Sequence, residues 1–307
     1  MYSERAIDPI SLSKEQVQKI CESCFGKKGE LKAFALLSGG AVNTTYQLLW
    51  GDEKLFLKLY VRDHTLADIE SHVYALVKNQ VAVPELLHVD LTYDPHPYAL
   101  FRFFEGKPIH ELGKEVAKEL SFELGKALSQ IHGFQFEKAG LFGRGLEIAV
   151  PFEEGSSPYF AYCKEQLVPE SLSWKRLGER RAKRLQEVIM EREKDFPMIG
   201  QGGVLVHSDF KPVNLLWSER EGLCTLDWEF AHVGDGLMDF AILLRHEEAF
   251  PCALSELERG YGKTFFNDWR EKVRLLDMIN VIQLLNMPGE RPELFKKLYY
   301  QICFFEK

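Results

Sequence analysis

Long apolar runs, excess positive charge and paired cysteine motifs are all scarce in this sequence of 307 residues. No stretch approaches the roughly 18 apolar residues that a membrane-spanning helix needs, so we expect no membrane contact. Basic residues number 38 against 46 acidic ones, and the net charge of −8 disfavours a general nucleic-acid binder. The first ten residues contain no apolar signal core, so a cytoplasmic protein is expected.

The six cysteines are too few and too scattered for a disulfide scaffold. Cys21 and Cys24 form a CxxC pair, but no second pair or histidine cluster stands at the spacing of a zinc site. Their segment has helical periodicity, so we interpret them as thiols near a helical core face. With 46% hydrophobic and 27% charged residues, the composition is that of an ordinary globular protein.

The pattern of apolar residues changes near Glu105 and Gly106. Before this point, the pattern predicts a mixture of strands and helices, and after it mainly helices around one β-rich stretch at 204–226. We therefore predict a small β-rich lobe over residues 1–104 and a larger, mainly helical lobe over residues 105–307. The main expected elements are helices at 13–24, 65–78 and 114–132, largely helical segments at 158–196 and after 238, and strands at 31–37, 44–49, 55–60 and 99–104.

The β-rich stretch contains His207-Ser208-Asp209-Phe210-Lys211-Pro212-Val213-Asn214, followed by a strand, a turn and a returning strand that ends at Asp227. A hairpin returns its end beside its beginning, so Asp227 is expected near Asn214 and Asp209. Two carboxylates and an amide carbonyl then converge, and such oxygens suit Mg²⁺ or the proton of a hydroxyl. The alternative is a plain turn, because Asp and Asn both favour turns.

These residues resemble the catalytic loop and the metal-binding segment of the protein-kinase-like superfamily. HSDFKPVN, LDWE and GDGLMDFA are most similar to the aminoglycoside phosphotransferase and choline kinase branch. The resemblance implies a two-lobed α+β fold, with Asp209 orienting the acceptor hydroxyl and taking its proton. It also implies that Asn214 and Asp227 hold Mg²⁺ on the nucleotide phosphates, and that His207 braces the loop.

Lys58 is the residue of the first lobe that the resemblance singles out. It stands among alternating leucines in LFLKLY, and the family places a phosphate-binding lysine on this strand. Glu70 in the next helix stands where the family has the partner acid, with Asp68 and Asp63 as alternatives. The competing interpretation is a lysine that extends to solvent from a strand edge.

The segment 38–44 occupies the place where the family covers the nucleotide phosphates. Its candidates are the backbone of Gly40 and the side chain of Asn43 or Thr44, although it departs from the G-x-G-x-x-G of protein kinases. The strand that ends near Arg102 and Phe104 would enter the hinge, where adenine pairs with backbone groups. The expected ligands of this lobe are therefore ATP or GTP.

Acidic residues occur where the family builds its acceptor wall. Glu153, Glu154 and Asp235 are candidates to bind an acceptor, and Glu229 could touch substrate or metal or make a structural hydrogen bond. We expect the acceptor to be a cationic, amine-bearing alcohol, although acidic surface residues also simply keep proteins soluble. Asp239 opens a helix, and we interpret it as an N-cap that also braces the catalytic loop.

The sequence thus predicts an Mg²⁺-dependent kinase that transfers the γ-phosphoryl group of ATP or GTP to a small-molecule hydroxyl, such as one on an aminoglycoside. A metabolic kinase for choline, ethanolamine, homoserine or a methylthio sugar would use the same machinery. A nucleotide-binding pseudokinase or scaffold is the alternative of another class, but it would more naturally have lost Lys58, Asp209, Asn214 or Asp227. No A-P-E motif marks a protein-kinase activation loop.

Overall fold

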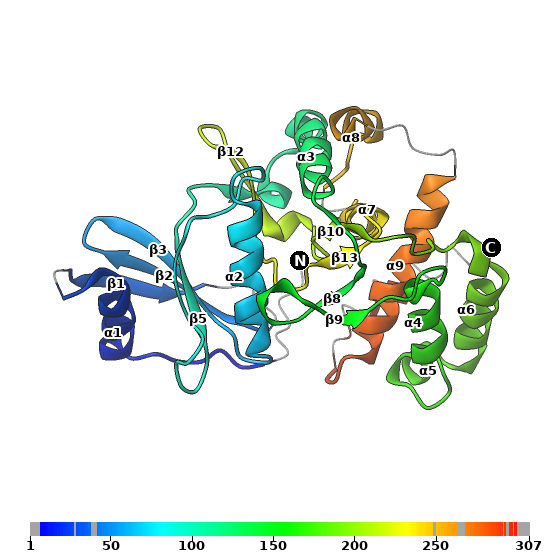
Figure 1. Cartoon of the computed structure of the whole chain (residues 1–307), viewed down its shortest axis with the longest axis horizontal. Helices are drawn as coiled ribbons and strands as arrows, with labels where there is room; N and C mark the ends of the chain where they lie inside the picture. Colours follow the sequence, from blue (N-terminus) through cyan, green and yellow to red (C-terminus); the bar gives the residue numbers. More distant parts are fainter. Residues whose placement is uncertain are drawn as a thin grey trace.

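The computed structural model describes residues 7–27, 29–37, 42–247, 250–262 and 268–290, with 292, 295–296 and 298–299. It shows a two-lobed α+β fold, with a β-rich N-terminal part beside a mainly helical part (Figure 1). Within these residues, no helix is both long enough and apolar enough to span a membrane.

The N-terminal part is an antiparallel sheet covered by one helix on each face. Its strand order is β1-β2-β3-β5-β4. In β3, Leu55 and Leu57 pack in the same core as helix α1, whereas Phe56 packs in the core that includes α2. The alternation of LFLKLY therefore separates the two faces and leaves Lys58 on the α2 face. The elements are α1 (Lys14–Phe25), β1 (Leu31–Leu36), β2 (Thr44–Trp50), β3 (Glu53–Leu59), α2 (Thr65–Val77), β4 (Leu86–Asp90) and β5 (Tyr98–Arg102).

The larger part combines seven described helices with two small sheets. Strands β7 (Gln135–Phe136), β8 (Gly140–Phe142), β9 (Ile148–Pro151), β10 (Gly203–Val206) and β13 (His232–Gly234) form one sheet in the order β7-β10-β13-β8-β9. Strands β6 (Lys107–Pro108), β11 (Leu215–Ser218) and β12 (Gly222–Thr225) form the other, with β11 in the middle. The helices are α3 (Ala117–Ile131), α4 (Pro158–Gln166), α5 (Leu172–Leu177), α6 (Glu179–Glu191), α7 (Leu237–Arg245), α8 (Leu254–Tyr261) and α9 (Trp269–Asn286).

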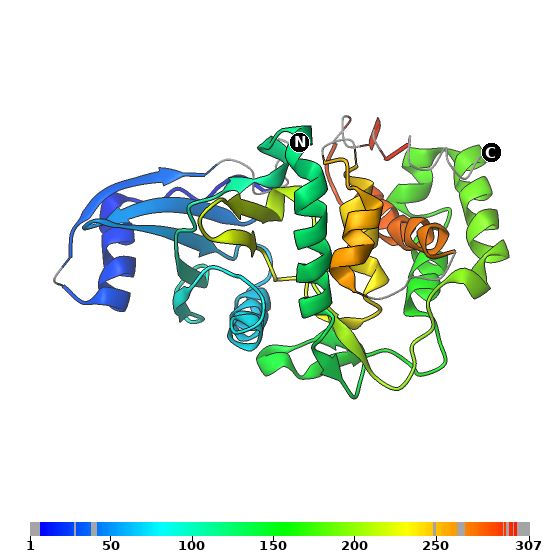
Figure 2. The same ribbon diagram turned by 90° about the horizontal axis from the view of Figure 1, so that it is seen from above.

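Helices α3 and α8 lie side by side in both views (Figures 1 and 2). Two glycines permit this close approach. A Cβ atom added to Gly125 would lie 2.1 Å from the carbonyl oxygen of Leu257, and one added to Gly260 would lie 2.0 Å from that of Phe122. No side chain fits at either position, so the two helices can approach this closely only with glycine at both.

Most of the expected elements are confirmed within a few residues. Ser13 caps α1 in a capping box with Gln16, and the helix predicted from residue 114 begins as the 3₁₀ turn η2 (Lys114–Val116) before α3. Strand β4 and the short strands β7, β8, β9 and β13 were not anticipated. Several have only two to four residues, too few for an alternating pattern to show. The division at residues 104 and 105 stays a prediction.

Candidate active site

The loop between β10 and β11 holds Asp209 through local hydrogen bonds. The Asn214 side-chain amide donates to the backbone oxygen of Asp209 at 3.0 Å and to its carboxylate Oδ2 at 2.8 Å. Lys211 Nζ also lies 2.8 Å from Oδ2, so Lys211 makes an ion pair within the loop. Ser208 has a φ of 67°, a left-handed conformation that re-aims the chain just before Asp209. The loop therefore holds a carboxylate with one oxygen, Oδ1, outside these contacts.

Asp239 braces this loop from α7. Its carboxylate accepts the backbone N–H groups of His207 and Ser208 at 2.9 and 2.8 Å, and His132 Nε2 lies 3.1 Å away. Burial alone would raise the pKa of Asp239, but the hydrogen bond and charge of His132 and the loop N–H groups lower it below its usual value. The expected brace is thus present, but the expected N-cap role is wrong. Asp239 is the third residue of α7, and Asp235 Oδ1 instead accepts the Leu237 N–H at 2.8 Å.

The β11–β12 hairpin returns Asp227 to the loop, as the sequence predicts. The Leu226 N–H donates to the Asn214 carbonyl at 2.9 Å. Asp227 itself has a φ of 67°, so the chain turns sharply at this residue. Its Oδ1 lies 2.5 Å from Lys58 Nζ, which comes from β3 in the other lobe.

Lys58 is a buried ammonium group among three carboxylates. Its Nζ lies 2.7 Å from Glu70 Oε2 and 3.2 Å from Glu229 Oε2, in addition to Asp227. Burial alone would lower the pKa of Lys58, but the three carboxylates raise it well above its usual value, so the ammonium stays charged. The structure pairs Lys58 with Glu70, whereas the alternative Asp68 accepts the Gly145 N–H at 2.7 Å.

Glu70 is held on several sides. Tyr60 donates its hydroxyl hydrogen to Glu70, and the Trp228 backbone N–H donates to Glu70 Oε1 at 2.8 Å. Tyr60 is a site residue that the sequence reasoning missed. A tyrosine at the end of LFLKLY, two positions after Lys58, is the only trace it leaves in the sequence.

A hydrogen bond between Asn43 and Glu229 connects the segment 38–44 to the segment that contains Asp227. Asn43 donates its amide hydrogen to Glu229, and its own Oδ1 accepts the Val61 N–H at 3.2 Å. Burial raises the pKa of Glu229 to about 7, against the opposing effect of Lys58. Asn43 therefore lies at the site, while Gly40 falls outside the described residues.

No described side-chain contact joins the other nucleotide candidates, Thr44, Arg102 and Phe104, to the Lys58 cluster. Thr44 pairs with Leu59 across the strands and accepts the Ile10 N–H at 2.9 Å, so its side chain is on the face opposite Lys58. Arg102 is exposed and its side chain pairs with Glu53 and Glu85. Phe104 is half-buried beside Gly106. The N–H groups of Arg102 and Phe103 already donate to the carbonyls of Glu85 and Lys54, at 2.9 and 3.0 Å.

The acceptor candidates are dispersed. Glu153 and Glu154 are exposed in the loop after β9, and no described contact joins their carboxylates to Asp209. The Asp235 N–H donates to the Tyr159 hydroxyl at 2.7 Å, and burial raises the pKa of Asp235. Of the acidic candidates, Glu229 alone is brought to the Lys58 cluster within the part of the chain that the structure describes.

The donor set suits a divalent cation. Asn214 uses its amide nitrogen toward Asp209, which leaves its carbonyl oxygen as a ligand. Carboxylate oxygens of Glu70, Asp227 and Glu229 lie within 4.8 Å of one another. Carboxylate and amide oxygens are the hard ligands that Mg²⁺ prefers, so the residues present fit this ion.

In this two-lobed fold, a lysine on a strand contacts a glutamate on a helix and an aspartate that follows a catalytic loop. This arrangement defines the class of kinase-like phosphotransferases. The chain belongs to the phosphotransferase enzyme family, whose model matches residues 33–275. Comparison with curated proteins gave no match.

Solved aminoglycoside phosphotransferases share this fold at low sequence identity. The GDP complex of aminoglycoside 2′-phosphotransferase-IIIa is 14% identical with a TM-score of 0.72, covering 96% of this chain and 99% of that one. A ternary complex of APH(4)-Ia with ADP and hygromycin B is 17% identical with a TM-score of 0.67, covering 94% and 96%. Spectinomycin phosphotransferase APH(9)-Ia, bound to ADP and spectinomycin, is 16% identical with a TM-score of 0.64, covering 97% and 98%.

Proposed function

We propose that this protein transfers the γ-phosphoryl group of ATP or GTP to a hydroxyl of a small, amine-bearing acceptor such as an aminoglycoside. Residues 1–104 would bind the nucleotide, and residues 105–307 would supply the catalytic loop and the acceptor site. The observation that carries the proposal is the position of Lys58, between Glu70 at 2.7 Å and Asp227 at 2.5 Å. Productive kinase sites require this alignment of lysine, helix glutamate and metal-binding aspartate.

Each residue has a distinct task in the proposed reaction. Asp209 accepts a hydrogen bond from the acceptor hydroxyl, orients its oxygen toward the γ-phosphorus and takes its proton. Lys58 contacts the α- and β-phosphates; Glu70 holds the lysine in place, and Tyr60 in turn holds Glu70. Asn214 and Asp227 would hold Mg²⁺, which when bound neutralises phosphate charge. Most of the rate then comes from positioning and electrostatic stabilisation.

The acceptor class is supported by the charge of the chain and by the solved relatives. The net charge of −8 attracts cations to the protein. Neighbouring structures hold hygromycin B, spectinomycin or kanamycin together with a nucleotide. We also propose a cytoplasmic location, where nucleotide is available; the described cysteines are free thiols, as suits a reducing compartment.

A nucleotide-consumption screen tests the proposal. ATP and GTP with Mg²⁺ would be tried against aminoglycosides, spectinomycin, macrolides, choline, ethanolamine, homoserine and a methylthio sugar, with Asp209→Asn as the matched control. We expect acceptor-dependent consumption with an amine-bearing alcohol, confirmed by mass spectrometry of the phosphorylated product, and none with the variant. If the best acceptor has no amine, the proposed acceptor class is wrong, while the assignment as a kinase is retained. Nucleotide binding without turnover on any acceptor would favour the pseudokinase.

A further inference from the structure

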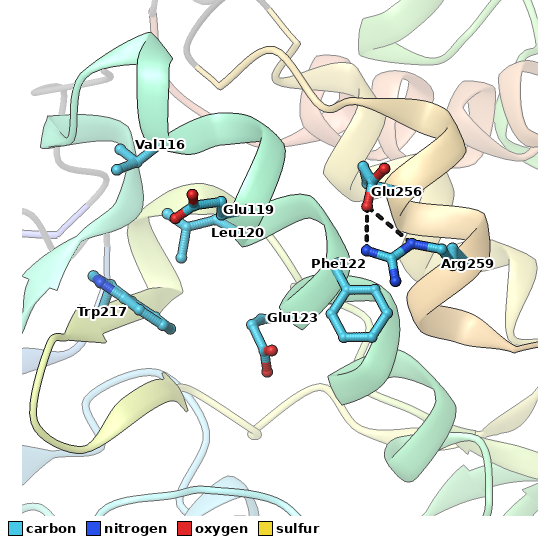
Figure 3. Close-up of a pocket in the computed structure, with 8 residues that line it drawn as sticks. All are labelled: Val116, Glu119, Leu120, Phe122, Glu123, Trp217, Glu256 and Arg259. Atoms are coloured by element: carbon cyan, nitrogen blue, oxygen red, sulfur yellow. Dashed lines mark hydrogen bonds and ion pairs between the residues drawn. The ribbon is translucent and has the colours of Figure 1, made fainter.

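A cavity of about 570 Å³ lies outside the active site, between α3, α8 and strand β11 (Figure 3). Its walls are Trp217, Phe122, Leu120 of α3 and Val116 of the turn η2, and glutamates project into it from both helices. The volume falls in the range of sites for small organic ligands. None of the active-site residues described above lines it.

One end of the cavity already holds a cation of the chain itself. The Arg259 guanidinium lies 4.2 Å from the centre of the Phe122 ring, and its Nη2 lies 2.5 Å from Glu256 Oε2. An aromatic face and a carboxylate together are a standard environment for a positively charged nitrogen. This end of the cavity is therefore occupied by the chain's own arginine.

The other end has the same chemistry, but no cation lies over its aromatic ring among the side chains that the structure describes. Figure 3 shows the Trp217 ring across the cavity from Glu119 and Glu123. Glu123 has only a long ion pair, 3.8 Å to the exposed Lys126, and Glu119 makes no ion pair or side-chain hydrogen bond among the residues that the structure describes. Tryptophan is the aromatic side chain that binds cations best.

We propose that this cavity binds an organic ammonium ion, with the charged nitrogen between Glu119 and Glu123 and an apolar body against Trp217. A metal ion would not use the aromatic wall. A neutral ligand would leave Glu119 without a counter-charge among the described residues, and Glu123 with only its long ion pair to Lys126. An ammonium group joined to a ring or an alkyl chain pairs its charge with the carboxylates and packs its apolar part against Trp217.

None of the acceptor candidates of the proposed kinase lines this cavity. Leu215 begins β11 directly after Asn214, so an occupant of the cavity would contact the strand that follows the catalytic loop. The proposal rests on the cavity alone and does not need the acceptor to be cationic.

Nuclear magnetic resonance of the nucleotide-free protein tests the proposal. The ¹⁵N-labelled chain has five tryptophan indole signals, and Trp217→Phe identifies the one at the cavity. 2-Phenylethylamine, which is protonated at neutral pH, is titrated in parallel with the neutral 2-phenylethanol. We expect the Trp217 signal to shift saturably as the amine is added. The dissociation constant for the alcohol should be at least about five-fold higher than that for the amine.

Two double variants separate the cavity from general electrostatic attraction. Glu119→Gln with Glu123→Gln should weaken amine binding about five-fold or more, since both counter-charges are lost. Glu191→Gln with Glu193→Gln, which removes two exposed charges elsewhere, should leave it unchanged. No shift at Trp217, equal affinity for the alcohol, or equal losses in the two double variants would overturn the proposal. Because no turnover is measured, failure here is distinct from failure of the kinase assignment.

Discussion

Lys58 shows how one residue organises the site. Its ammonium group is buried and faces carboxylates from α2 and from the segment after β12, which gives the cluster a net negative charge. A divalent cation that arrives with the nucleotide would reduce that excess, while Lys58 becomes available to the phosphates. The cluster is thus suited to exchange an internal ion pair for Mg²⁺ and nucleotide.

The pairing of Lys58 with Glu70 predicts coupled effects on nucleotide binding. Lys58→Ala should weaken nucleotide affinity, and Glu70→Ala should do so less severely, because it leaves the lysine in place but no longer oriented. In the double variant, the loss of binding free energy should be smaller than the sum of the single losses by about 1 kcal/mol or more. Titration calorimetry of the four proteins measures this coupling.

Asp68 supplies the matched control for this cycle. It lies in the same helix, but its carboxylate accepts the Gly145 N–H, away from Lys58. Asp68→Ala should therefore be additive with Lys58→Ala. Coupling through Asp68 and none through Glu70 would contradict the geometry described above.

At the scale of the element, strand register separates what the sequence could predict from what it could not. The alternation in LFLKLY places Lys58 on one face of β3 from sequence alone. Which of Thr44 and Thr45 shares that face depends on how β2 pairs with β3, and the observed register pairs Thr45 with Lys58. Both residues suit a strand, so no local pattern distinguishes them. The motif at Asp209 was easier, because a loop and one hairpin bring Asn214 and Asp227 together locally.

The start of α7 shows a similar limit. An aspartate near a predicted helix start favours an N-cap, and this rule predicts Asp239 as the cap, while Asp235 is expected at the acceptor site. Helix α7 begins at Leu237, whose N–H donates to Asp235. Asp239 therefore lies inside the helix and supports the catalytic loop. Helix ends are set by such competing hydrogen bonds, and the sequence does not rank them.

The lowered pKa of Asp239 predicts that the stability of the fold depends on pH. Because its pKa is lower in the folded chain, its contribution is complete above the unfolded value of about 3.9 and is lost as the pH falls below it. Asp239→Asn should lower the free energy of unfolding by about 2 kcal/mol at pH 7, and by less at pH 3. Urea unfolding at the two pH values checks this. An equal loss at both would show that the charge of Asp239 is unimportant, and the surface variant Glu191→Gln should change neither value.

At the scale of the whole molecule, side chains from the two lobes meet directly. Asn43 bonds to Glu229, Lys58 to Asp227, and Glu70 to the Trp228 N–H. These partners are 158 to 186 residues apart in the sequence. Spacing alone cannot predict such pairs, and the resemblance to a known family supplied Lys58, Glu70 and Asp227 together. It supplied neither the bond from Asn43 to Glu229 nor the contact of Tyr60 with Glu70.

The central proposal is that Asp209 serves the acceptor, while the Lys58 cluster, whose side chains come from both lobes, serves the nucleotide. Asp209→Asn tests it most directly, because the substitution keeps the shape of the side chain and removes the acceptor for the hydroxyl proton. We expect kcat to fall about a thousand-fold while the Kd for the Mg²⁺–nucleotide complex stays within about two-fold of the original. Steady-state kinetics with the best acceptor, together with calorimetric nucleotide binding, measure both. Full turnover in Asp209→Asn, or a loss of activity explained entirely by weaker nucleotide binding, would contradict the account.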